Sequence, residues 1–137
     1  MREILFRGKR TDNGEWIEGY LVEKTIFSIF DTHLSFVIYK KPTNIYHEEY
    51  RGINPSTVGQ YTGLTDKNGT KIFEGDIIQN TANGNFGIVR WYDEHAAFVI
   101  QGINDNKTYW LFDNDFSKVR IVGNIFDTPE LLEVRNG

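Results

Sequence analysis

Three histidines, His33, His47 and His95, are the side chains of this sequence best suited to proton transfer or metal binding at neutral pH. No two of them have the spacing of a metal-ligand pair. His47-Glu48-Glu49 begins like the zinc-binding helix of a metallopeptidase, but Arg51 stands where that helix requires its second histidine. We therefore interpret His47 as a solvated loop residue.

Two acidic stretches also have residue types that could carry chemistry. Asp93-Glu94-His95 has the composition of a hydrolase acid–base cluster, but it lies at the tip of a predicted hairpin, where charged residues are the solvated choice. Asp113-Asn114-Asp115 begins like a calcium loop, yet Lys118 replaces the glycine of its turn and Asn124 replaces its bidentate glutamate. Neither stretch predicts a catalytic or metal site.

Other catalytic signatures are missing from the sequence. There is no cysteine, which excludes disulfides, thiolate zinc sites and cysteine nucleophiles together. There is no phosphate-binding loop, and no serine lies in a recognisable nucleophile signature. We predict no catalytic residue, no metal ligand and no cofactor, and hence a protein that is not an enzyme.

Basic and aromatic residues near the start of the chain favour binding instead. A candidate interaction surface consists of Arg7, Lys9, Arg10, Trp16 and Tyr61. Guanidinium groups beside aromatic rings can hold a phosphate backbone and stack bases. Alternatively, the alternation of a strand turns these cations to the solvated side of a sheet edge, and tyrosines such as Tyr61 pack within the sheet. The formal net charge of −4 opposes sequence-independent binding to nucleic acid.

Composition limits the fold and the cellular compartment. A chain of 137 residues forms one compact domain or two small lobes. Its 10 phenylalanines, 7 tyrosines and 3 tryptophans favour sheets over helix bundles, and its 13 glycines predict many tight turns. The first residues are too short in apolar run for a signal peptide, and no stretch is apolar over the roughly 20 residues of a membrane span. We expect a cytoplasmic protein.

The first half of the chain predicts short hairpins and a variable loop. Thr11-Asp12-Asn13-Gly14 and Asp66-Lys67-Asn68-Gly69 are hairpin turns in which glycine accepts a positive φ. Ile26–Phe30 and Phe36–Tyr39 predict another hairpin. Residues 45–53 are predicted to form a surface loop, which Asn54-Pro55-Ser56 ends as a turn.

The second half predicts a strand-rich lobe with a short helix at its end. Predicted strands occupy residues 86–92, 96–101, 108–112 and 118–122. Thr128 and Pro129 have the residue types of a helix N-cap and first position, so a helix is predicted over 129–134. We predict a mostly β protein, with a lobe of β-hairpins in residues 1–56 and an SH3-like barrel with a C-terminal helix in residues 57–137.

Several blocks of the sequence resemble the YopX family of bacteriophage and prophage proteins. The blocks are Phe6-Arg7-Gly8-Lys9 with Trp16 and Gly19, Thr57–Leu64 with Asp66–Gly69, Ile72–Ile77, Val122–Phe126 and Pro129–Leu132. The resemblance implies a mostly β fold, a phage or prophage origin and a homo-oligomer. It supplies no reaction and no catalytic residue.

Two functions are therefore expected. The first is a non-catalytic, self-associating protein-interaction module, with further copies or a phage or host protein as partner, in the cytoplasm of the bacterial host. The alternative is a small nucleic-acid-binding β-barrel that uses the basic and aromatic face around Arg7, Lys9 and Arg10.

Overall fold

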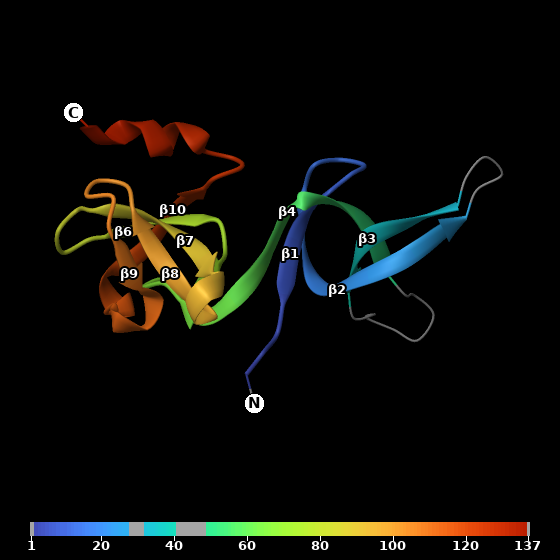
Figure 1. Cartoon of the computed structure of the whole chain (residues 1–137), viewed down its shortest axis with the longest axis horizontal. Helices are drawn as coiled ribbons and strands as arrows, with labels where there is room; N and C mark the ends of the chain where they lie inside the picture. The colour runs from blue at the N-terminus through green and yellow to red at the C-terminus, as the bar shows by residue number, and fades with distance from the viewer. Residues whose placement is uncertain (1, 28–31, 41–48, 137) are drawn as a thin grey trace. The chain divides into compact units, whose positions relative to one another are not determined.

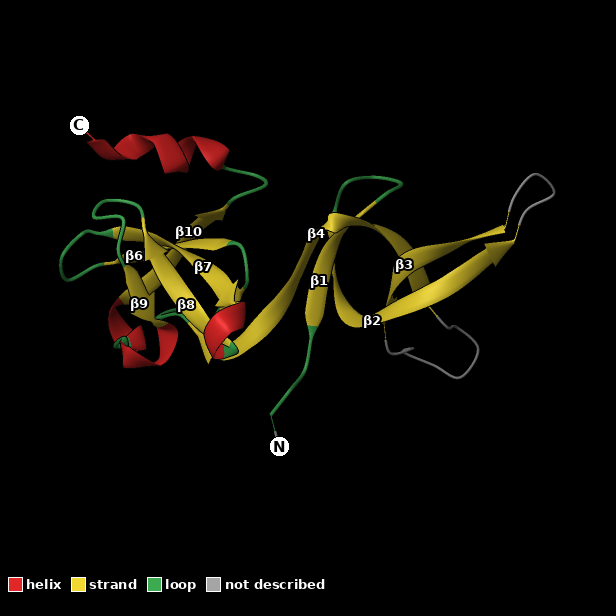
Figure 2. Ribbon diagram, in the orientation of Figure 1, coloured by secondary structure: helices red, strands yellow, loops and turns green. Residues whose placement is uncertain are grey.

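The structure is a computed structural model that describes residues 2–27, 32–40 and 49–136. These residues form ten β-strands and four 3-10 helices, so the predicted mostly β class is confirmed (Figure 2). The chain divides into two compact units, Met1–Gln60 and Tyr61–Gly137, within the long strand β4 (Glu49–Thr65). The boundary predicted between residues 56 and 57 falls in the same strand. No helix in the described part of the chain is long and apolar enough to cross a membrane.

The first unit is built from antiparallel strands whose pairings run in a closed circuit (Figure 1). Its elements are β1 (Phe6–Arg10), β2 (Trp16–Phe27), β3 (Thr32–Lys40) and the first part of β4. Strand β1 pairs with both β2 and β4, and β3 pairs with β2 and β4. Ile17, Ile38 and Ile53 form its buried core.

The predicted hairpin at Thr11–Gly14 joins β1 to β2, and Gly14 has a φ of +73°. Strand β4 includes Asn54-Pro55-Ser56, which was predicted to be a turn. It also includes residues 49–53, the end of the predicted surface loop. The Asn54 Oδ1 atom accepts a hydrogen bond from the Ser56 backbone N–H at 3.1 Å, and the register with β1 shifts there. These turn residues therefore make a bulge within a continuous strand, which local turn propensity alone does not distinguish from a connection.

Gly19 lets β2 approach β3 closely in the first unit. A Cβ at this position would lie 2.3 Å from the Tyr39 carbonyl oxygen and 2.7 Å from Ile38 Cγ2. Because a carbonyl in a sheet cannot move aside as a flexible side chain can, this position accepts only glycine without rearrangement.

The second unit contains a five-stranded antiparallel sheet in the order β10-β6-β7-β8-β9. Its strands are β6 (Asp76–Asn80), β7 (Phe86–Tyr92), β8 (Ala97–Gly102), β9 (Thr108–Trp110) and β10 (Val119–Asn124). A short strand, β5 (Lys71–Phe73), pairs with the end of β4 around the predicted Asp66–Gly69 turn, where Gly69 has a φ of +80°. No pairing joins β9 to β10 among the described strands, so the SH3-like barrel stays a prediction.

The helix predicted from Pro129 begins at that residue but is a 3-10 helix, η4 (Pro129–Asn136), and not an α-helix. The expected N-cap hydroxyl is used elsewhere. Thr128 Oγ1 donates to the Asn124 carbonyl oxygen and accepts from the Asn124 N–H, both at 3.0 Å. The side chain therefore closes the turn after β10 and does not satisfy an N–H of the helix.

A buried carboxylate ties the first turn of the second unit to its last strand. Asp66 is 7% exposed. Its Oδ1 accepts from the N–H groups of Asn68 and Thr70 at 2.9 and 3.0 Å, and its Oδ2 accepts from that of Ile121 at 3.1 Å. Alongside, the Lys67 N–H donates to the Val119 carbonyl at 2.8 Å. The outer side of β10 is thereby closed by the turn.

Replacing Asp66 with asparagine should lower the free energy of unfolding at neutral pH by about 1–3 kcal/mol. The amide of asparagine places a donor where the carboxylate accepts, so one backbone N–H loses its acceptor. Asp113→Asn, at an exposed carboxylate, is the matched control and should change stability by less than about 0.5 kcal/mol. Urea unfolding followed by circular dichroism measures both.

Wild type and Asp66→Asn also test how the free energy of unfolding depends on pH. Burial raises the pKa of Asp66, but the N–H groups of Ile121, Thr70 and Asn68 together outweigh it and place the pKa below its ordinary value. A lowered pKa contributes stability above the unfolded pKa of about 3.9, and this is lost as the pH falls through the folded value. The difference in free energy of unfolding between wild type and Asp66→Asn should therefore become smaller below about pH 4. A constant difference down to about pH 2 would contradict this.

Gly19→Ala should destabilise the first unit by about 3 kcal/mol, because the added methyl overlaps the Tyr39 carbonyl. Gly52→Ala is the matched control, since its Cβ meets only Thr11 Oγ1, at 3.2 Å, and should cost less than about 1 kcal/mol. Thermal unfolding of both variants checks this. Equal losses would show that the close approach at Gly19 is unimportant.

Candidate functional site

Two of the cations at the start of the chain, Arg7 and Lys9, lie beside Trp16 in the first unit. Lys9 on β1 lies opposite Trp16 on β2. The Arg7 guanidinium carbon lies 4.6 Å from the centroid of the Trp16 ring, and Lys9 Nζ lies 5.4 Å from it. Both distances are within the roughly 6 Å over which a cation is attracted to an aromatic face.

Arg10 is engaged within its own hairpin. Its Nε donates to Asp12 Oδ1 at 2.9 Å and its Nη2 donates to Asp12 Oδ2 at 2.6 Å. The hydrogen bond from Arg10 holds the pKa of Asp12 below its ordinary value. Strand β1 is not a sheet edge, because it pairs with both β2 and β4, so the interpretation of these cations as protection of an edge is wrong.

Tyr61 lies in the second unit and is 9% exposed. Its ring packs against Phe73 with the centroids 5.6 Å apart. This is sheet packing, the alternative interpretation of this tyrosine, and it leaves little of the ring for a partner.

The residues considered for chemistry belong to different elements of the structure. His33 lies on β3 opposite Ile26, and His47 lies outside the described residues. Asp93-Glu94-His95 forms the 3-10 helix η1 between β7 and β8. Among the described residues, no group of three His, Asp or Glu side chains could hold a metal ion.

Asp113-Asn114-Asp115 organises two short 3-10 helices, η2 (Leu111–Asp113) and η3 (Phe116–Lys118). Asn114 Nδ2 donates to the carbonyl oxygens of Trp110 and Leu111 at 3.0 and 3.3 Å. Asp115 Oδ1 accepts from the Ser117 hydroxyl at 2.6 Å and from its N–H, and these bonds lower the pKa of Asp115.

A run of aromatic rings on the second unit is the feature that sequence reasoning missed. We call it the aromatic ladder; it consists of Tyr92, His95, Trp110 and Phe112. Neighbouring ring centroids lie 4.9, 5.3 and 6.1 Å apart in that order. Phe112 is 71% exposed, and Tyr92 and Trp110 are each 37% exposed. Contiguous exposed aromatic surface is uncommon on a protein that acts alone and is typical of contact surfaces.

The ladder forms because two strands end in aromatic residues beside one turn. Strand β7 ends at Tyr92, β9 ends at Trp110, and His95 in η1 places its imidazole between their rings. Both strands and the turn were predicted. The order of the strands in the sheet, in which β8 lies between β7 and β9, was not predicted. That order brings Tyr92 and Trp110 to the same imidazole.

Strand β9 is also an end strand of its sheet. It pairs with β8 through Thr108, Tyr109 and Trp110, and within the described part of the chain no strand pairs with its other side. The opposite end strand, β10, is closed by the Asp66 turn. Of the two ends, β9 is the one that no turn of the described residues closes in this way, although its last carbonyl, that of Trp110, accepts from Asn114 Nδ2.

Comparisons with known proteins place the chain. A search of curated proteins found no match. The chain is similar to the crystal structure of protein EF1440 from Enterococcus faecalis, with a TM-score of 0.50 and 22% sequence identity. The match covers 96% of this chain and 99% of that protein's chain, and at this identity it concerns the fold alone. The family model described as YopX protein matches residues 5–133. The resemblance seen in the sequence blocks is thus confirmed over nearly the whole length, and the chain belongs to the YopX family.

Proposed function

We propose that the chain is a non-catalytic protein-interaction module whose partner is a second copy of itself, bound through the aromatic ladder and the open side of β9. A phage or prophage origin and the cytoplasm of a bacterial host are part of this proposal. The single observation that carries it is the exposed ladder of Tyr92, His95, Trp110 and Phe112.

The energetics favour association at this surface. An aromatic side chain buries roughly 150–250 Å² when it is covered, and burial contributes about 25 cal/mol per Å². For Phe112, which is 71% exposed, covering the ring is worth about 3–4 kcal/mol. In a twofold contact each copy supplies the same residues, so this contribution counts twice.

The open side of β9 supplies orientation. An end strand can pair with the same strand of a second copy in antiparallel register, and hydrogen bonds between backbones then align the two ladders. Strand β9 has only the residues Thr108–Trp110, so pairing alone would be weak. The aromatic contact is therefore the principal source of affinity in this proposal.

The environment of His95 supports a non-catalytic role. Its ring packs between Tyr92 and Trp110, and Tyr92 Oη donates to Glu94 Oε2 at 3.2 Å. That hydrogen bond raises the pKa of Tyr92. These contacts join two of the three residues considered as an acid–base cluster, Glu94 and His95, to the ladder.

Sedimentation velocity at micromolar concentration tests self-association. Wild type should sediment as a dimer or larger assembly, and Phe112→Ser should shift it toward monomer by at least tenfold in dissociation constant, equal to about 1.4 kcal/mol. Ile4→Ser, at an exposed apolar residue of the first unit, is the control and should leave the assembly unchanged.

The effect of salt on self-association is a second test. Asp93, Glu94 and Asp113 neighbour the ladder in sequence, so two ladders in contact bring like charges together. Added salt should therefore strengthen the assembly. A monomeric wild type, or an assembly that salt dissociates and Phe112→Ser leaves intact, contradicts the proposal.

The cation–π contacts of Arg7 and Lys9 with Trp16 favour one second candidate, nucleic-acid binding by the first unit. Fluorescence anisotropy with a labelled single-stranded oligonucleotide should then detect binding that falls with salt. The double variant Arg7→Ala/Lys9→Ala should weaken it at least tenfold, whereas Lys118→Ala should have little effect. No binding at low salt would remove this candidate.

A further inference from the structure

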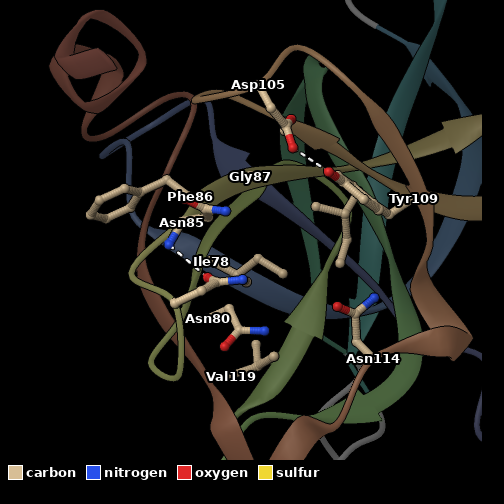
Figure 3. Close-up of a pocket in the computed structure, with 12 residues that line it drawn as sticks. Ile78, Asn80, Asn85, Phe86, Gly87, Asp105, Tyr109, Asn114 and Val119 are labelled. Carbon is tan, nitrogen blue, oxygen red and sulfur yellow. Dashed lines mark hydrogen bonds between the residues drawn. The ribbon is translucent and has the colours of Figure 1, made fainter. Parts of the chain in front are cut away.

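A cavity opens in the second unit beside the loops that join β6 to β7 and β8 to β9 (Figure 3). Its volume is about 130 Å³. The lining combines an apolar floor with a polar rim. The floor includes Ile78, Ile100 and Val119, and the rim includes Asn80, Asn83, Asn85, Asn114, Asp105 and Tyr109.

The volume matches a single ring. A protein cavity of about 150 Å³ lined by apolar side chains is large enough to hold benzene. At about 130 Å³ this cavity is close to that size and well below the roughly 300 Å³ at which pockets for drug-sized ligands begin. A monocyclic ligand fits it, and the apolar floor suits the face of a flat ring.

Each of three asparagines of the rim uses one polar atom of its amide in a hydrogen bond to the backbone and has the other available for a ligand. Asn80 Oδ1 accepts from the Ala82 N–H and Asn83 Oδ1 accepts from the Asn85 N–H, both at 2.9 Å, which fixes each amide by its oxygen. Asn114 is held by its nitrogen, through Nδ2 to the Trp110 carbonyl. The rim thus presents donors from Asn80 and Asn83 and an acceptor from Asn114.

The charges at the cavity select against anions. None of the residues that line it is lysine or arginine. Asp105 accepts a hydrogen bond from Tyr109 Oη, as Figure 3 shows, and another from the Lys107 N–H. The bond from Tyr109 lowers the pKa of Asp105, and the same contact raises the pKa of Tyr109. At neutral pH the rim therefore carries one carboxylate and repels phosphate.

We propose that this cavity binds an uncharged pyrimidine-type base or its nucleoside. The ring lies on Ile78, Ile100 and Val119, and the amides of the rim pair with its alternating carbonyl and N–H edge. The amide nitrogens of Asn80 and Asn83 donate to the ring carbonyls, and Asn114 Oδ1 accepts from the ring N–H.

This site is separate from the proposed self-association surface. Successive residues of a strand point to opposite faces, so β9 directs Tyr109 toward the cavity and Trp110 toward the aromatic ladder. The two proposals rest on different side chains, and Phe112→Ser should leave ligand binding unchanged.

Saturation-transfer difference NMR and calorimetry with uridine and cytidine test the proposal. Both nucleosides should bind at millimolar concentration, and uridine monophosphate should bind at least tenfold more weakly than uridine because its phosphate meets the Asp105 carboxylate. Free ribose should not bind. The base protons should receive the strongest saturation transfer, since the ring faces the floor.

Two variants locate the site without disturbing the fold. Asn80→Asp keeps the oxygen that accepts from Ala82 but replaces the amide donor with a carboxylate, so uridine should bind at least tenfold more weakly. Asn54→Asp makes the same change in the first unit, where the side-chain oxygen accepts from Ser56, and should have no effect. Absence of nucleoside binding, equal binding of ribose, or unchanged affinity in Asn80→Asp overturns the proposal.

Discussion

The hydrogen bonds of the Asp66 carboxylate are the constraint on which the second unit depends. One buried side chain accepts from the backbone of its own turn and from Ile121, which is 55 residues away in the sequence. Together with the bond from Lys67 to Val119, it closes the outer side of β10. The sheet consequently has one end that the turn closes and another, at β9, that it does not, and the proposed self-association uses this second end.

Strand β9 connects the two candidate sites of the second unit. It has only three residues, and two of them contribute to different sites because neighbouring side chains alternate between faces. Tyr109 lies at the rim of the cavity, where it holds Asp105. Trp110 packs against His95 in the aromatic ladder. A chain without catalytic signatures can in this way offer a contact surface and a small polar cavity from one short strand.

The sequence predicted features that depend on neighbouring residues. The turns at Gly14 and Gly69, strand β7 and the start of η4 at Pro129 all follow from local chemistry and are confirmed. Features that depend on contacts between residues far apart in the sequence could not be predicted from it. Asn54–Ser56 has turn chemistry but lies within β4, because pairing with β1 outweighs local preference. Thr128 has N-cap chemistry but bonds to Asn124. The ladder and the cavity needed the order of strands, which periodicity does not reveal.

Amide hydrogen exchange at Ile121 tests the central role of Asp66 most directly. In wild type the Ile121 N–H should be protected at neutral pH, because its acceptor is a buried carboxylate. In Asp66→Asn its protection should fall at least tenfold, while amides of the β2–β3 pair in the first unit keep theirs. Equal exchange at Ile121 in both proteins would contradict the account and would mean that β10 is held in place without this carboxylate.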